Sequence, residues 1–218
     1  MRVLGLAVVL GVAAARMQAA QMNELRLEYS NPNLMPAQWT LVMWPDGRGH
    51  FHAERGNAKD RNQDEASMEP AVIDRDVQLS GTFAGQMFQI LRHHPLQAGQ
   101  CESRSKVAFQ GWKKLEYSGP NGVGACEFNF AKDREIGAVA DSLIAVAATL
   151  IEGARLEMIL VHDPLGLDKE MDYLTEAAGD GRLLQIRTIR NILLRLGDDS
   201  TVMERVRRRA EKLAECQQ

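Results

Sequence analysis

The sequence has few cysteines and no large excess of charge of one sign. Beyond residue 20 it has no hydrophobic run long enough to suggest a transmembrane segment. Its 218 residues hold 3 Cys, and 26 Lys and Arg face 29 Asp and Glu, which gives a formal net charge of −3. With a pI near 6.0, the whole chain has no cationic footprint for phosphate, so we expect no nucleic-acid partner. A length of 218 residues suits one large domain or two small ones, and a hydrophobic content of 45% is ordinary for a soluble globular protein.

Familiar catalytic motifs are also missing. The chain contains no H-E-x-x-H helix signature, Walker A loop, dinucleotide fingerprint or CxxC pair, and no serine lies in a G-x-S-x-G elbow. The glycine-rich stretch "SGPNGVG" at 118–124 is not followed by Gly-Lys-Ser/Thr, so we interpret it as a hairpin turn. These absences favour a non-enzymatic binding or interaction module over an enzyme.

The longest apolar run lies at the N-terminus, where Arg2 precedes Val3–Ala15 and small residues follow. Residues 1–20 therefore have the organisation of a secretory signal peptide. Ala13-Ala14-Ala15 fits the cleavage rule, and a cut after Ala20 is the alternative. A run of about 13 residues is shorter than the roughly 20 that span a bilayer, although a retained anchor is the other interpretation. We expect a periplasmic or secreted protein with no transmembrane segment after cleavage.

Export changes what the cysteines imply, because thiols pair in oxidising compartments. We expect a disulfide between Cys101 and Cys126, which flank a predicted strand region. Cys216 lies near the chain end and is expected to be free. A bond from Cys216 to either of the others is the alternative.

The hydrophobic pattern changes character near residue 132. Leu25, Leu27 and Tyr29 alternate with charged residues as in a half-buried strand, and strand signals continue to residue 131 with one helix near 82–93. Beyond that point apolar residues recur at helical spacing. The predicted fold is α+β: residues 21–131 form an antiparallel sheet with one helix, and residues 132–218 form antiparallel helices. The pattern leaves open whether these are one domain or two.

Three local signals concern helix ends. Asp133 is a plausible N-cap for a helix that runs past residue 150. Gly153 either ends that helix or lies inside a longer one. Thr201-x-x-Glu204 reads as a capping box before the last helix.

"GHFHAE", residues 49–54, carries the clearest candidate site. On a strand, His50, His52 and Glu54 would share one face, and an H-x-H pair can hold zinc or copper with the carboxylate as a third ligand or general base. A metal-dependent hydrolase is therefore the alternative function, with His93, His94 or His162 as the distant ligand. The simpler interpretation is the solvated side of a hairpin strand.

The densest basic run, Arg205 to Arg209, is expected to be a solvated helix face. Its alternative is a cationic patch that binds an anionic surface or an acidic partner. A protein or a cell-envelope component is the partner class we expect.

Residues 117–130, "YSGPNGVGACEFNF", and residues 151–178, which begin "IEGARLEMILVHDPLGLDKEMDYL", carry a resemblance. The chain resembles a family of uncharacterised exported bacterial proteins that pair a Cys-containing β-region with a helical C-terminal half. The resemblance implies export and this general layout, and it brings no activity, cofactor or site residue.

Overall fold

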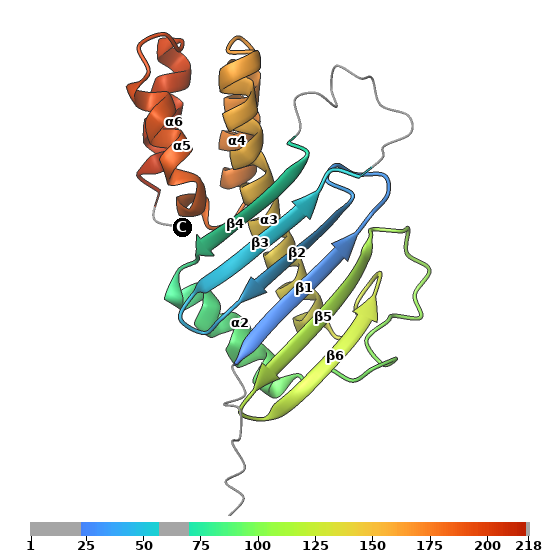
Figure 1. The fold of residues 1–218 in the computed structure, drawn as a ribbon. Helices are drawn as coiled ribbons and strands as arrows, with labels where there is room; N and C mark the ends of the chain where they lie inside the picture. The colour runs from blue at the N-terminus through green and yellow to red at the C-terminus, as the bar shows by residue number, and fades with distance from the viewer. Residues whose placement is uncertain (1–22, 57–69, 217–218) are drawn as a thin grey trace, which may run out of the picture.

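A computed structural model describes residues 23–56 and 70–216 of the chain. The predicted signal peptide, residues 1–20, lies outside these described residues. The described residues form an α+β fold in which an antiparallel sheet occupies the N-terminal half and helices follow (Figure 1). The fold class expected from the sequence is thus confirmed.

The sheet has six strands in the order β4-β3-β2-β1-β5-β6, and every neighbouring pair is antiparallel. Alternate residues are buried along β1, β2 and β3, because successive side chains point to opposite faces. The strands are β1 Glu24–Ser30, β2 Gln38–Met43, β3 Arg48–Glu54, β4 Val72–Gln78, β5 Trp112–Gly119 and β6 Gly122–Phe128.

Two helices cover one face of the sheet. Helix α2, Gly81–His93, and the first half of α3, Arg134–His162, bury their apolar sides against the strands. Phe51, Phe88 and Leu143 are fully buried in this first core. Figure 1 shows both helices behind the sheet, with the opposite face toward the viewer.

The remaining helices form a second core around the other half of α3. Leu156 and Ile159 of α3 belong to that core, so one 29-residue helix takes part in both. The expected boundary at 131/132 falls just before α3, whose first half packs on the sheet. The other members are α4 Leu167–Gly179, the short 3₁₀ helix η1 Ile186–Ile189, α5 Arg190–Asp198 and α6 Glu204–Ala214.

Of the two predicted helix N-caps, the structure confirms one and contradicts the other. The Asp133 side chain accepts bonds from the backbone N–H groups of Glu135 and Ile136, so the predicted N-cap of α3 is confirmed. The predicted capping box at Thr201 is wrong. The Thr201 hydroxyl instead donates to Asp199, and α6 begins at Glu204 without a side-chain cap.

Gly153 lies inside α3 and does not end it. A β-carbon built on Gly153 would lie 2.2 Å from Cγ2 of Ile189, a residue of η1. The absence of a side chain therefore lets η1 approach α3 closely.

The predicted disulfide is present. Cys101 and Cys126 are joined by an S–S bond of 2.10 Å, with their Cα atoms 5.9 Å apart. It ties the segment after α2 to β6, and Ser103 N–H of that segment donates to the carbonyl of Phe130, two residues past the end of β6. Cys216 is a free, exposed cysteine in the described part of the chain. Among the helices of the described residues, none combines the length and apolar character needed to cross a bilayer.

Candidate functional site

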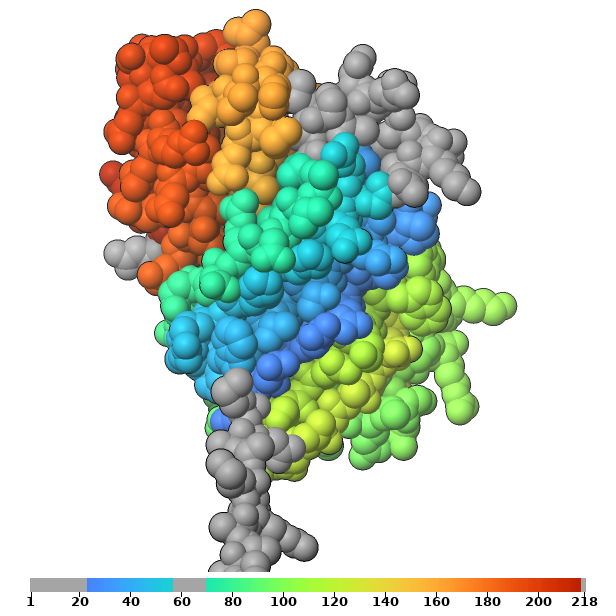
Figure 2. Space-filling model, in the orientation of Figure 1, coloured from blue at the N-terminus to red at the C-terminus, as the bar shows by residue number. Residues whose placement is uncertain are grey.

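The face of the sheet opposite α2 and α3 is covered by none of the described helices, and we call it the open face (Figure 2). The inward side chains are mostly apolar; the exceptions include the buried Lys113 and Arg75, which pairs with Glu157 of α3. The outward side chains are mostly polar or charged because they meet water. The space-filling view shows the strands of the open face running side by side across the front of the molecule.

Strand register arranges these outward side chains in rows across the sheet. One row runs Glu54, Gln38, Ser30, Trp112 through β3, β2, β1 and β5. The next row runs Asp74, His52, Thr40, Glu28, Lys114, Glu127 through all six strands. Neighbouring strands are ~4.8 Å apart, so Glu54 and Trp112 are separated by roughly 14 Å.

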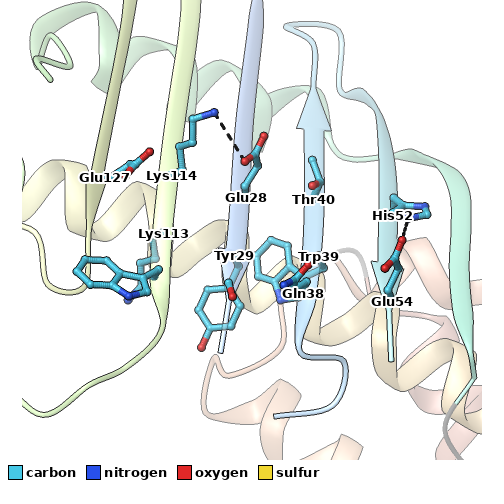
Figure 3. Close-up of a pocket in the computed structure, with 12 residues that line it drawn as sticks. Glu28, Tyr29, Gln38, Trp39, Thr40, His52, Glu54, Lys113, Lys114 and Glu127 are labelled. Atoms are coloured by element: carbon cyan, nitrogen blue, oxygen red, sulfur yellow. Dashed lines mark hydrogen bonds and ion pairs between the residues drawn. The ribbon is translucent and has the colours of Figure 1, made fainter. Parts of the chain in front are cut away.

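A hollow of about 420 Å³ lies over these two rows. Ser30 and Thr40 are small side chains in its middle, and Trp112 and Glu54 stand at its two sides. Trp112 is 55% exposed and contacts Phe109 edge-on, with 6.2 Å between ring centroids. In Figure 3, Lys114 reaches toward Glu28 on one side and His52 toward Glu54 on the other.

The three residues singled out from the sequence, His50, His52 and Glu54, all lie on the open face of β3. Strand β4 places Asp76 opposite His50 and Asp74 opposite His52. We call these five residues the His–acid strip.

Three hydrogen bonds and one ion-pair contact connect the strip from end to end. Nδ1 of His50 lies 2.9 Å from Oδ1 of Asp76, and Nδ1 of His52 lies 2.8 Å from Oδ2 of Asp74. Asp74 also approaches Nε2 of His50 at 3.5 Å, and Nε2 of His52 lies 3.4 Å from Glu54. Carboxylates and imidazoles therefore alternate along the strip.

The hydrogen bond between His52 and Asp74 shifts the pKa values of both side chains. The Asp74 carboxylate, followed by Glu54, raises the pKa of His52 above its ordinary value of 6.5. The same bond lowers the pKa of Asp74 below 3.8. A raised histidine pKa adds stability at low pH that is lost as pH rises through the folded value. A lowered aspartate pKa adds stability that is lost as pH falls through its own folded value. The His52–Asp74 pair therefore stabilises the fold most at pH values between the folded pKa of Asp74 and the folded pKa of His52.

An NMR titration of the histidine ring signals tests this coupling. We expect His52 to titrate above 6.5 and to move toward that value in Asp74→Asn, because the largest cause of the shift is removed. Asp76→Asn is the matched control, since it removes the partner of His50 on the same strand. An equal change of the His52 pKa in both variants would contradict the assignment.

The predicted metal ligands are thus brought to one face, but the distant histidines are not. His94 lies at the end of α2 and contacts Asp133 at 2.8 Å, while His93 and His162 are the last residues of α2 and α3. A cation on the strip would have to compete with the imidazole–carboxylate bonds. Within residues 23–56 and 70–216, no group of three or more His, Cys, Asp or Glu residues is arranged to hold a metal ion.

The basic run of α6 is largely engaged by acidic neighbours. Arg205 and Arg209 both contact Asp168 of α4, and Arg209 also contacts Asp172 at 2.5 Å. Arg208 pairs with Glu204 one turn away. These contacts join α6 to α4, which favours a structural role over the cationic-patch alternative.

Sequence reasoning missed Asp74, Asp76 and Trp112 as members of this surface. Asp74 and Asp76 occupy alternate positions in "VIDRDV", between Ile73, Arg75 and Val77, so their shared direction was readable. Their pairing with His52 and His50 depends on strand register, which the local sequence does not specify.

Comparison with known proteins gives no family for the chain: no family model matches it, and neither does any curated protein.

Proposed function

We propose that the protein is exported and acts as a non-enzymatic binding module that holds a partner on its open face. The observation that carries this proposal is the hollow over the uncovered side of the sheet, lined by the exposed Trp112 and by polar side chains from β1, β2, β3, β5 and β6. Binding sites combine a concave surface with an aromatic anchor and a few placed polar groups. The predicted signal peptide and the Cys101–Cys126 disulfide support export to an oxidising compartment. Membership of the exported family named above is part of the same proposal.

Site-resolved photo-crosslinking in the producing cells tests where a partner binds. A photoreactive residue replaces Thr40, which lines the hollow, or Lys169, which is exposed on α4. We expect a defined adduct from position 40 that is lost when Trp112→Ala is added, because the indole is the largest exposed anchor at the hollow. Adducts from position 169 alone, or equally from both positions, would refute the open face as the binding surface.

The alternative function is a metal-dependent hydrolase built on His50, His52 and Glu54, with zinc or copper as the ion. Its support is that β4 adds the oxygen donors Asp74 and Asp76 beside the two imidazoles. This alternative requires that purified protein binds the ion and that His50→Ala/His52→Ala removes it, as elemental analysis would measure.

A further inference from the structure

The open face carries more negative charge than the whole chain. Its outward residues include seven acidic side chains and three basic ones, a net charge of −4 with neutral histidines, against −3 for the chain. The acidic residues are Glu24, Glu28, Glu54, Asp74, Asp76, Glu116 and Glu127, and the basic ones are Arg26, Arg48 and Lys114. A chain cut after Ala20 loses Arg2 and Arg16 and has a net charge of −5, so the open face holds most of the net negative charge of the exported protein.

This charge is unevenly distributed over the open face. In the middle, Arg26 and Lys114 each contact both Glu28 and Glu116, so two cations face two carboxylates. Arg48 is paired with Asp46 in the β2–β3 turn. The His–acid strip has three carboxylates whose nearest partners are two histidines, and it is the most acidic part while these are neutral.

The hollow beside the strip has the chemistry of a cation site. Trp112 offers an exposed indole, and Glu28, Glu54 and Glu127 line the same space. Two lysines also line it: Lys114 is paired with Glu28, and the buried Lys113 donates to backbone carbonyls. A Lys or Arg side chain is attracted both to the face of an indole and to carboxylates. Anionic surfaces such as phosphate-bearing membranes are repelled by the same arrangement.

The spacing of the strip matches an extended chain. Outward residues of β3 and β4 recur every second position, about 6.8 Å along the strand, which is also the repeat of same-side side chains in an extended peptide. A single small cation would contact only one of these repeated positions. A segment with several basic side chains can meet the strip and the hollow together.

We propose that the partner of the open face is an extended, Lys/Arg-rich segment of another protein, lying along the His–acid strip with one basic side chain in the hollow beside Trp112. This inference rests on the proposed function, because it names the chemical class of the partner bound there. Charge complementarity is its basis, and complementary charge also speeds association and selects among partners.

The probe is a fluorescein-labelled peptide of about ten residues that alternates lysine with serine, in the repeat of an extended strand; its counterpart alternates glutamate with serine. By fluorescence anisotropy, we expect the lysine peptide to bind the purified protein in about 20 mM NaCl and to weaken about tenfold in about 200 mM NaCl. We expect the glutamate peptide not to bind.

The decisive variant is Glu54→Lys/Glu127→Lys, which reverses two exposed charges at opposite sides of the hollow. We expect at least a tenfold loss of affinity, and a smaller loss in Glu54→Gln/Glu127→Gln, which keeps the assay informative if the reversal perturbs folding. The matched control is Asp198→Lys/Glu215→Lys. It changes the net charge equally at exposed positions ending α5 and α6 and should bind nearly as the unmodified protein does.

Equal losses in the two reversal variants would show general attraction to an acidic protein and would overturn the proposal. So would binding that Trp112→Ala leaves unchanged, or no binding of the lysine peptide at low salt. If crosslinks from position 40 persist while the lysine peptide fails to bind, the open face remains the binding surface and only its cationic partner class is wrong.

Discussion

Replacing both Cys101 and Cys126 with serine is expected to lower the free energy of unfolding by about 3.5 kcal/mol. The bridge joins residues 25 positions apart and restricts the unfolded chain, which is the main source of disulfide stabilisation. Chemical denaturation of the oxidised protein and the double variant measures the difference. Cys216→Ser is the control, because Cys216 is exposed and free, and we expect it to leave stability unchanged.

Thiol counting completes this test. The folded, oxidised protein should show one reactive thiol, and three after denaturation and reduction. A double variant within about 0.5 kcal/mol of the unmodified protein would contradict the expected contribution of the bridge. The bridge also anchors the segment that leads into Trp112 at the start of β5, so its loss should weaken binding at the hollow too.

Gly153→Ala is expected to lower the free energy of unfolding by about 2 kcal/mol, although alanine favours helix by about 1 kcal/mol over glycine. The reason is steric: the new β-carbon would lie 2.2 Å from Cγ2 and 3.0 Å from Cβ of Ile189. These are atoms at the base of a β-branched side chain, which cannot turn away easily.

A second glycine in the same helix provides the control. A β-carbon on Gly137 would meet its nearest neighbour, Ala131, at 3.4 Å, so Gly137→Ala should be neutral or slightly stabilising. Adding Ile189→Ala to Gly153→Ala should remove the repulsion but leave the cost of the lost side chain. Thermal unfolding measures the stability of these three variants. Equal stability of Gly153→Ala and Gly137→Ala would refute the close packing of η1 on α3.

The contrast between Asp133 and Thr201 shows how far sequence signals reach. Both belong to recognised N-cap patterns, yet only Asp133 caps its helix. Thr201 lies two residues after Asp199, which takes its hydroxyl in a local turn, and such side-chain competition is a property of the whole turn. Periodicity was sufficient to predict the fold class, since strand and helix differ in repeat.

The candidate site was only half predictable for a related reason. The shared face of His50, His52 and Glu54 follows from the two-residue repeat of a single strand. Asp74 and Asp76 come from a strand paired through long-range register. The place of Trp112 in the hollow depends on β5 pairing with β1, which is distant in the sequence. Such contacts are decided by the packing of the whole sheet.

The continuity of α3 has a mechanical consequence. A 29-residue helix is a stiff rod roughly 43 Å long; one end supports the rear of the sheet and the other is clamped by α4, η1 and α5. Because α3 is one continuous helix, the position of the C-terminal helices is fixed relative to the sheet. The open face is therefore supported from behind by α2 and by the first half of α3.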